Sequence, residues 1–146
     1  KTKSPQETEQ FGIKFASKLH GGDIVLLSGN LGAGKTALVK GIAKGFDIQN
    51  TITSPTFTLM NVYPISQKQT AVSQLVHIDT YRLKDEQELI EIGAEDYLGK
   101  PDTVCLIEWP DKIEGLLKKY NQKNFTFIEI KQLENPEERE IIWKKN

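Results

Sequence analysis

The sequence predicts a three-layer α/β fold in which helices cover both faces of a mixed, largely parallel central sheet. Two apolar runs, at residues 24–27 and 104–107, are uninterrupted, as in parallel strands buried on both faces. A segment with helical spacing follows each of these runs. Two further strand-like runs, at 57–63 and 74–79, predict an antiparallel pair, which makes the sheet mixed.

The size and charge of the chain limit its organisation and partners. With 146 residues, 38% of them apolar, we expect residues 1–146 to form one domain with a substantial core. The net charge is −1 and the lysines are scattered, so we expect no autonomous nucleic-acid binding. The single cysteine, Cys105, fits a reducing compartment, and we expect a cytoplasmic protein. No apolar stretch is long enough for a membrane span or a secretory signal, so we expect no membrane partner.

Capping and breaking residues set the elements in the first half of the chain. Ser4 is suited to cap a helix whose first position is Pro5, because the serine hydroxyl accepts from an unpaired amide and proline needs no donor there. Pro55 biases the residue before it away from helical angles. The expected elements are a helix from Ser4 to Gly21–Gly22, a strand at 23–28, a helix at 37–44 that closes at 45–47, a loop at 52–56 and a strand at 57–63.

The second half alternates strands with short helices. Acidic residues near position 85 and a glycine at position 93 bound one helix. Trp109–Pro110 ends the apolar strand before it, and Asn135–Pro136 makes a turn before a last segment that is a strand or a short helix. The expected elements are a polar excursion at 64–73, a strand at 74–79, a helix at 85–92, a strand at 103–108, a helix at 111–120, and strands at 125–131 and 139–144.

One motif joins the strand at 23–28 to the helix at 37–44. It is the P-loop, or Walker A, pattern Gly29-Asn30-Leu31-Gly32-Ala33-Gly34-Lys35-Thr36. The pattern turns a buried strand into a helix, so that backbone N–H groups point into one concavity at the helix N-terminus. Its glycines allow left-handed angles, Lys35 can reach the β- and γ-phosphates, and the Thr36 hydroxyl can bind Mg²⁺. The motif therefore predicts nucleotide binding; the alternative is a glycine-rich turn with a chance lysine.

Two acids end apolar strands. Asp79 and Glu108 should emerge at the carboxyl edge of the sheet, where open α/β folds bind ligands. We predict that Glu108 and Thr36 hold Mg²⁺, that Lys35 neutralises the charge that develops on the phosphates, and that Asp79 is a candidate to orient the attacking water. The alternative is that both are solvated acids at strand ends.

Other polar and aromatic residues near the motif have two interpretations. The hydroxyls of Thr53, Ser54 and Thr56 form either a switch around the metal and the γ-phosphate or a surface turn. His77 is more typical of a satisfied structural residue than of a catalyst. Trp109, by its residue type alone, is more typical of a packing residue.

Four blocks beyond the P-loop match the pattern of one family, and the first two of them together are specific for it. They are Ser54-Pro55-Thr56-Phe57-Thr58-Leu59, His77-Ile78-Asp79-Thr80-Tyr81-Arg82-Leu83, Glu88-Leu89 with Gly93, and Ile107-Glu108-Trp109-Pro110. With these blocks the chain resembles the TsaE (YjeE) family, small ATPases of bacterial tRNA threonylcarbamoyladenosine biosynthesis. The resemblance implies a P-loop NTPase fold with a mixed sheet, binding of ATP or ADP with Mg²⁺, and weak ATPase activity of the chain alone.

The resemblance also implies partners and residue roles. It implies assembly with TsaB and TsaD, where hydrolysis supports repeated modification of adenosine 37 in ANN-decoding tRNAs, reached indirectly through the complex. It makes Thr36 and Glu108 metal-site residues, Asp79 a nucleotide-site acid and residues 54–56 a nucleotide-sensing loop. It gives Trp109 a role near the site. It also predicts that the adenine rests between Pro5 and Glu138.

Two other P-loop functions remain as alternatives. A small-molecule kinase commonly closes an arginine-bearing lid over the transferring phosphate, and this chain has two arginines, Arg82 and Arg139. A GTP-driven switch would need a base-specifying N-K-x-D segment, which the sequence lacks. We therefore rank the ATPase first, the kinase second and the GTP switch third.

Overall fold

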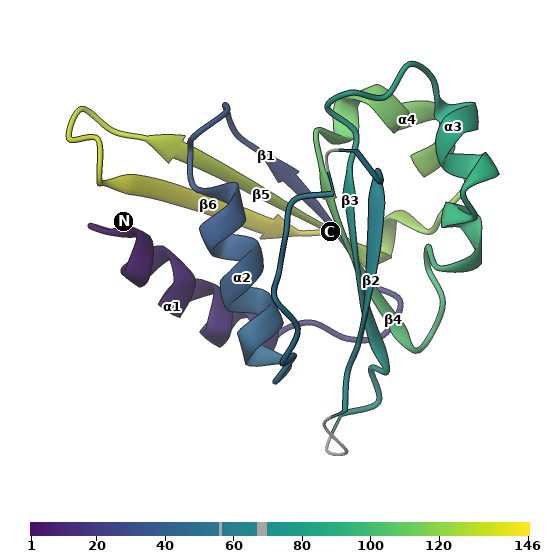
Figure 1. Cartoon of the computed structure of the whole chain (residues 1–146), viewed down its shortest axis with the longest axis horizontal. Coiled ribbons are helices and arrows are strands. Elements are labelled where there is room, and N and C mark those ends of the chain that lie inside the picture. The colour runs from purple at the N-terminus through teal and green to yellow at the C-terminus, as the bar shows by residue number, and fades with distance from the viewer. Residues whose placement is uncertain (56, 67–69) are drawn as a thin grey trace.

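A computed structural model describes residues 1–55, 57–66 and 70–146 (Figure 1). Its strands are β1 (Ile24–Ser28), β2 (Met60–Pro64), β3 (Gln74–Asp79), β4 (Thr103–Glu108), β5 (Phe125–Gln132) and β6 (Arg139–Lys145). Its α-helices are α1 (Pro5–Ala16), α2 (Lys35–Gly45), α3 (Glu86–Glu91) and α4 (Glu114–Leu117), and short 3₁₀ turns cover 94–96, 110–113 and 122–124.

The strands form one mixed sheet in the order β2-β3-β4-β1-β5-β6. The four inner strands, β3, β4, β1 and β5, run parallel. The edge strands β2 and β6 pair antiparallel with β3 and β5. The predicted antiparallel pair and the strand interpretation of the last segment are therefore confirmed.

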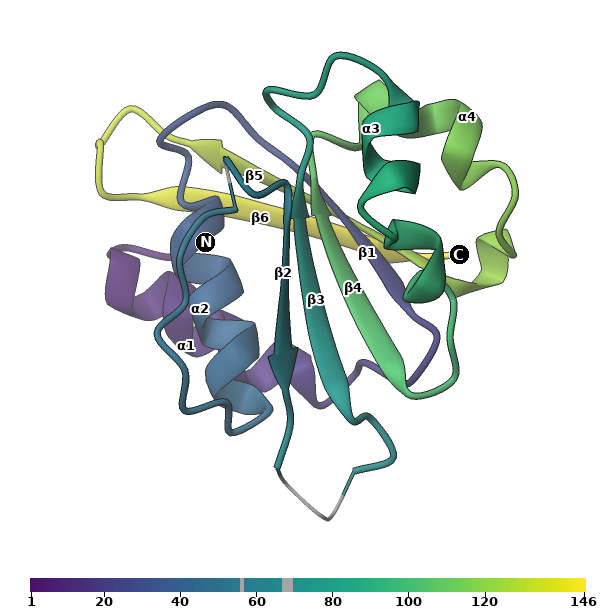
Figure 2. The same ribbon diagram turned by 45° about the vertical axis from the view of Figure 1, so that its right-hand side comes forward.

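Both faces of the sheet are covered, which gives three layers. Leu27 of β1 and Leu106 of β4 belong to an apolar cluster with α1 and α2. Their neighbours Leu26 and Ile107 belong to a second cluster, with α3 and α4, on the opposite face. Figure 2 shows the two helix layers on either side of the sheet. The predicted α/β fold with a mixed, largely parallel sheet is confirmed.

Helix α2 is held tightly against α1, and the two lie side by side in Figures 1 and 2. A Cβ atom on Gly41 of α2 would lie 2.1 Å from the carbonyl oxygen of Glu9, and one on Gly12 of α1 would lie 2.6 Å from that of Leu38. Only glycine allows backbones to approach this closely. The contact fixes α2, and with it the residues at its N-terminus.

Two predicted boundaries in the first half are wrong. Helix α1 ends at Ala16, five residues before Gly21, because the Ser17 hydroxyl donates to the Lys14 carbonyl (2.8 Å) and tight turns follow. Strand β2 begins at Met60 rather than at residue 57. Leu59 has a positive φ of 65° and its amide donates to the Pro55 carbonyl, so a turn precedes the strand.

The predicted helix at 111–120 is also shorter than expected. Trp109 adopts a left-handed backbone (φ 59°), a 3₁₀ turn follows it, and α4 covers only Glu114–Leu117. The strands predicted at 74–79 and 103–108 have the expected bounds. The loop predicted at 52–56 is neither helix nor strand over residues 52–55.

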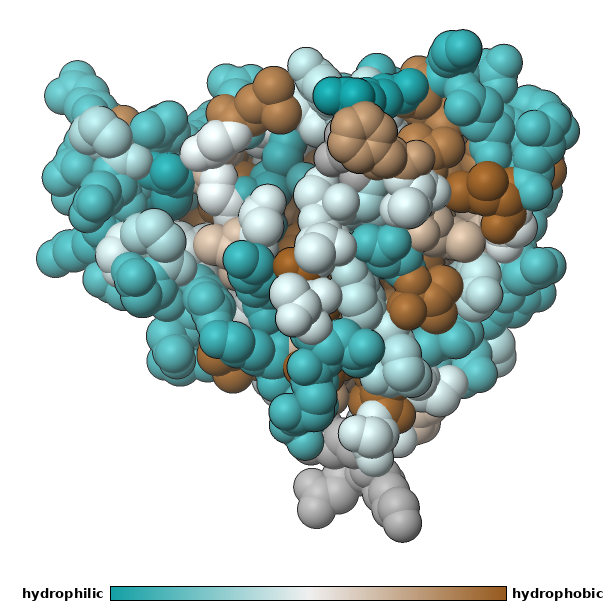
Figure 3. Space-filling view, viewed as in Figure 1, coloured by the Kyte–Doolittle hydropathy of each residue, from teal (hydrophilic) through white to brown (hydrophobic). Residues whose placement is uncertain are grey.

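The surface seen in Figure 3 is mostly polar, with hydrophobic residues in separate patches, several of them near α3 and α4. Within the described ranges, no helix is long and apolar enough to cross a membrane.

Candidate functional site

The P-loop motif lies at the turn from β1 to α2. Gly32 (φ 79°) and Gly34 (φ 104°) have the predicted left-handed backbone, and Gly34 is the residue immediately before α2. A Cβ atom on Gly29 would lie 2.7 Å from the carbonyl oxygen of Ile130, which makes a side chain unacceptable there. The loop amides therefore gather at the N-terminus of α2, where a helix favours an anion.

A cavity of about 460 Å³ opens beside this loop. Its wall brings together Lys35 and Thr36 from the start of α2, Asp79 from β3, and Glu108 and Trp109 from the end of β4. Three separate segments thus supply one cation, one hydroxyl and two carboxylates. The other lining residues are Leu31, Gly32, Gly34, Ser54, Tyr81 and Arg82.

The two carboxylates are neighbours in the sheet. Asp79 and Glu108 are register partners at the carboxyl ends of β3 and β4, and both are buried. Asp79 accepts hydrogen bonds from the Tyr81 amide (2.9 Å) and the Ser54 hydroxyl (3.3 Å). The interpretation of these residues as solvated strand-end acids does not fit this burial. Ser54 also lies in the cavity wall.

Glu108 has a buried partner that the sequence interpretation did not pair with it. His77 Nε2 lies 2.6 Å from Glu108 Oε2, while His77 Nδ1 is buried without a hydrogen-bond partner in the described part of the chain. A carboxylate oxygen accepts hydrogen bonds, so the proton of this contact lies on Nε2. His77 then donates to Glu108 and orients its carboxylate.

Lys35 is held against the wall of the cavity. Its ammonium donates to the Gly29 carbonyl and lies 3.8 Å from the centroid of the Trp109 ring. Burial lowers the pKa of Lys35, while the charges of Glu108 and Asp79 act in the opposite direction. Trp109 also contacts the Tyr81 ring, at a centroid separation of 5.2 Å, so this tryptophan lies in the site rather than in either apolar cluster.

The donor atoms of this cavity fit Mg²⁺. In residues 1–55, 57–66 and 70–146, no group of three or more His, Cys, Asp or Glu side chains forms a metal cage. Mg²⁺ does not need one, because it commonly binds through one or two carboxylates together with phosphates and water. The hydroxyl of Thr36 and the carboxylate of Glu108 line the same cavity and supply hard oxygen ligands.

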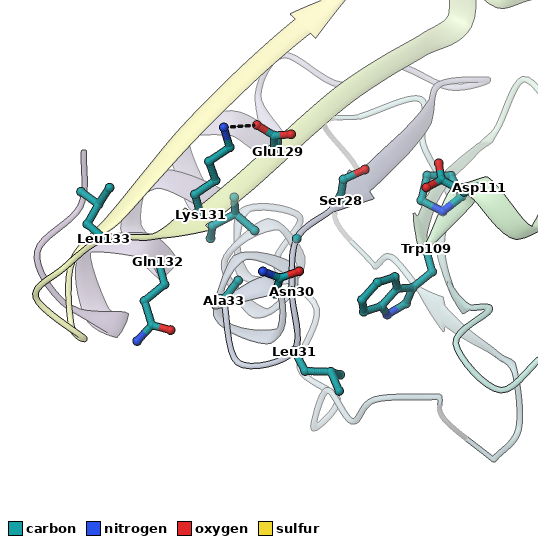
Figure 4. Close-up of a pocket in the computed structure, with 13 residues that line it drawn as sticks. Ser28, Asn30, Leu31, Ala33, Trp109, Asp111, Glu129, Lys131, Gln132 and Leu133 are labelled. Carbon is teal, nitrogen blue, oxygen red and sulfur yellow. Dashed lines mark ion pairs between the residues drawn. The ribbon is translucent and has the colours of Figure 1, made fainter.

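A larger cavity, of about 610 Å³, also lies beside the loop (Figure 4). Asn30 and Ala33 line it together with the end of β5, and Leu31 and Trp109 border both cavities. None of the cation, hydroxyl and carboxylate groups at 35, 36, 79 and 108 lines it. These four groups therefore line only the smaller cavity, whereas Gly29, Asn30 and Ala33 of the P-loop line only the larger one.

Two described residues predicted to contact nucleotide lie away from the cavities beside the loop. Pro5 is exposed at the start of α1, and Glu138 immediately precedes β6. The backbone pairing of Thr2 with Arg139 brings these two segments together, but neither Pro5 nor Glu138 lines the two cavities beside the loop. Thr56 lies outside the described residues.

The sequence interpretation missed the contact of Arg139 with the loop. The guanidinium of Arg139 donates to the carbonyls of Ala33 (2.6 Å) and Gly32 (3.2 Å), more than 100 residues away in the sequence. No local pattern signals such a contact.

Comparisons with known proteins give a consistent result. The family model described as "Threonylcarbamoyl adenosine biosynthesis protein TsaE" matches residues 2–141. A tRNA threonylcarbamoyladenosine biosynthesis protein TsaE from Haemophilus influenzae is 42% identical over 74% of this chain and 68% of its own length. The protein of the same name from Rickettsia prowazekii is 43% identical, over 78% and 75%. The crystal structure of Bacillus subtilis YdiB superposes with a TM-score of 0.72, at 31% identity, over 99% of this chain and 82% of YdiB.

Proposed function

Because this chain belongs to the TsaE family of threonylcarbamoyl adenosine biosynthesis proteins, which have a P-loop NTPase-like fold, we propose that it is an ATP-binding and ATP-hydrolysing subunit for tRNA threonylcarbamoylation. The product is threonylcarbamoylated adenosine 37 of ANN-decoding tRNAs. The observation that supports this best is the convergence of Lys35, Thr36 and Glu108 on one cavity at the N-terminus of α2.

The loop and Lys35 bind the triphosphate. The amides at the N-terminus of α2 receive the phosphate oxygens, since they have no partner within the helix. Lys35 exchanges its bond to the Gly29 carbonyl for the β- and γ-phosphates, which offer it a full negative charge instead of a dipole. Thr36 and Glu108 hold Mg²⁺, which when bound neutralises charge on the phosphate oxygens.

Hydrogen bonds hold the carboxylates of Asp79 and Glu108 in fixed positions. Asp79 accepts hydrogen bonds at both oxygens, from the Tyr81 amide and the Ser54 hydroxyl. In our proposal this carboxylate orients the attacking water. His77 holds one oxygen of the Glu108 carboxylate, which leaves the other oxygen for the proposed metal. The acids are thus set in position before nucleotide binds, which lowers the reorganisation needed for the reaction.

The proposed partners are TsaB and TsaD. A net charge of −1 with scattered lysines does not favour direct binding of RNA, so we propose that tRNA is reached through the partner complex. We expect ATP hydrolysis by the chain alone to be weak, and we expect association with TsaB and TsaD to increase it.

The test is ATP turnover by the purified chain alone, with TsaB and TsaD, and with both partners and substrate tRNA. We expect slow turnover alone, faster turnover in the complex, and more threonylcarbamoyladenosine formed when the chain is added. Glu108→Gln is the control for contaminating ATPases. No binding to TsaB–TsaD in the presence of ATP, together with no gain of modified tRNA, would refute the proposal.

The kinase alternative gains no support from the two arginines. Arg139 is occupied by loop carbonyls, and only Arg82 lines the cavity. Phosphoryl transfer to a metabolite faster than hydrolysis would reverse the ranking.

A further inference from the structure

Arg139 joins three segments that are far apart in the sequence. It is the first residue of β6, and its backbone exchanges two hydrogen bonds with Thr2, at 2.8 and 2.9 Å. Residue 2 lies just before α1, which packs on α2. The backbone of Arg139 is therefore fixed between the N-terminal segment and the sheet, and its side chain extends from a rigid position.

The guanidinium lies against the outside of the P-loop. Nε donates to the Ala33 carbonyl at 2.6 Å, and Nη2 donates to the Gly32 carbonyl at 3.2 Å. Nη1 donates to the carbonyls of Pro136 and Glu138. One planar group thus ties two consecutive loop carbonyls to the turn between β5 and β6.

This contact determines which way the loop peptides face. A peptide unit carries its N–H and C=O on opposite sides, so holding the carbonyls of Gly32 and Ala33 fixes the amides of Ala33 and Gly34 on the side away from Arg139. The Ala33 amide donates to the Asn30 carbonyl (3.0 Å), which closes the turn, and the Gly34 amide is directed away from the guanidinium. Gly34 leaves room for this approach, because a Cβ atom there would lie 3.3 Å from Arg139 Nε. The loop's glycines alone would leave the peptides free to turn.

The same contact brings an unneutralised positive charge to the loop. All the described acceptors of Arg139 are backbone carbonyls, and no carboxylate of a described residue lies within 4.0 Å of it. An acid partner would cancel this charge, whereas carbonyl dipoles leave most of its field in place.

We propose that Arg139 is a positioning residue of the phosphate-binding loop: its guanidinium fixes the Gly32 and Ala33 peptides, so that the turn at Ala33 is held closed and the Gly34 amide faces a nucleoside di- or triphosphate. This inference rests on the proposed function for the identity of the ligand, but the ordering of the loop is a property of the chain itself. A lysine cannot replace this arginine, because its single ammonium lacks the planar, fixed set of N–H donors with which the guanidinium contacts both carbonyls.

The experiment compares Arg139→Lys and Arg139→Gln with the unchanged chain. Lys144→Gln is the matched control, since it removes a positive charge from an exposed position of the same strand. Amide hydrogen exchange of residues 29–36 is measured without nucleotide, and Mg-ADP affinity is measured by calorimetry. Thermal unfolding shows whether each variant folds.

We expect both Arg139 variants to exchange the loop amides at least 10-fold faster and to bind Mg-ADP at least 10-fold more weakly, with Lys144→Gln unchanged in both. Loop exchange in Arg139→Lys equal to that of the unchanged chain overturns the inference, whatever the affinity. Faster exchange with no ADP binding by any form, the unchanged chain included, supports the ordering role and refutes the proposed function instead. If Arg139→Lys fails to fold, Arg139→Gln decides by the same two readouts, and failure of both while Lys144→Gln folds overturns a role confined to the loop.

Discussion

His77 and Glu108 form a buried pair, with Nε2 of the histidine 2.6 Å from Oε2 of the acid. The two residues lie on adjacent parallel strands, where His77 is opposite Leu106 and so one step below Glu108 on the same face. A carboxylate at the edge of the sheet is thus supported from inside the protein. The pair links the core to the proposed metal site.

Removal of this support affects stability and activity together. In His77→Leu, a buried carboxylate oxygen loses its donor, and we expect the free energy of unfolding to fall by about 1–3 kcal/mol. ATP turnover should fall as well, because Glu108 is no longer oriented. His77→Gln, whose amide nitrogen can occupy the position of Nε2, should recover part of both quantities. Urea unfolding and steady-state turnover measure them, and equal losses in the two variants would contradict the proposed hydrogen bond.

Asp79→Asn separates catalysis from packing. The asparagine keeps the shape of the side chain and can still accept from the Tyr81 amide, so we expect little change in stability. The loss of the carboxylate should lower turnover about 100-fold or more, as for removal of a residue that handles a proton or positions the water. Asp111→Asn is the control, because Asp111 is an exposed acid that lines only the larger cavity. Unchanged turnover in Asp79→Asn would remove Asp79 from the mechanism.

Lys35→Ala tests the electrostatic part of nucleotide binding. A charge-assisted contact contributes about 1.5–3 kcal/mol, so ATP affinity should fall about 10- to 150-fold. Lys40→Ala, on an exposed position of the same helix, should bind ATP normally. Calorimetric titration with Mg-ATP gives both constants. An affinity of Lys35→Ala within a factor of two of the unchanged chain would show that Lys35 does not contact the phosphates.

Cys105 predicts a pH dependence of stability. Burial raises its pKa from the ordinary 9.0 to about 12, so the unfolded chain loses this proton at lower pH than the folded one. The stabilisation is complete below pH 9 and is lost as the pH rises towards 12. Between pH 8 and pH 10, this thiol should lower the free energy of unfolding by about 1.4 kcal/mol. Urea unfolding of Cys105→Ala should lack that decrement, and an identical pH slope in both proteins would contradict it.

Most of the fold could be predicted from local signals in the sequence. The P-loop, the buried runs of β1 and β4, and the Ser4–Pro5 cap all depend on residues close in sequence, and the structure has them where predicted. The predicted end of α1 was wrong because the Ser17 hydroxyl forms a hydrogen bond that ends the helix before Gly21 and Gly22 are reached. The strand predicted to begin at residue 57 begins later, because a turn in which Leu59 has a left-handed backbone precedes β2.

The site was only partly predictable. Asp79 and Glu108 could be placed, because acids that end parallel strands meet at one edge. The partner of Glu108 depends on the register of β3 against β4, and the Arg139 contact depends on the packing of the C-terminal hairpin against a loop over 100 residues away. Neither relationship has a period or spacing in the sequence.

The most direct test of the account is a titration of the isotopically labelled chain with Mg-ATP, or with Mg-ADP if turnover interferes, followed by backbone amide chemical shifts. We predict the largest changes at residues 29–36, with further changes at Asp79, Glu108 and Trp109, and their loss when Mg²⁺ is omitted or Lys35 is replaced by alanine. Binding that shifts only residues of the larger cavity near Gln132 and Leu133, or no binding at all, would contradict the claim that the smaller cavity holds the nucleotide.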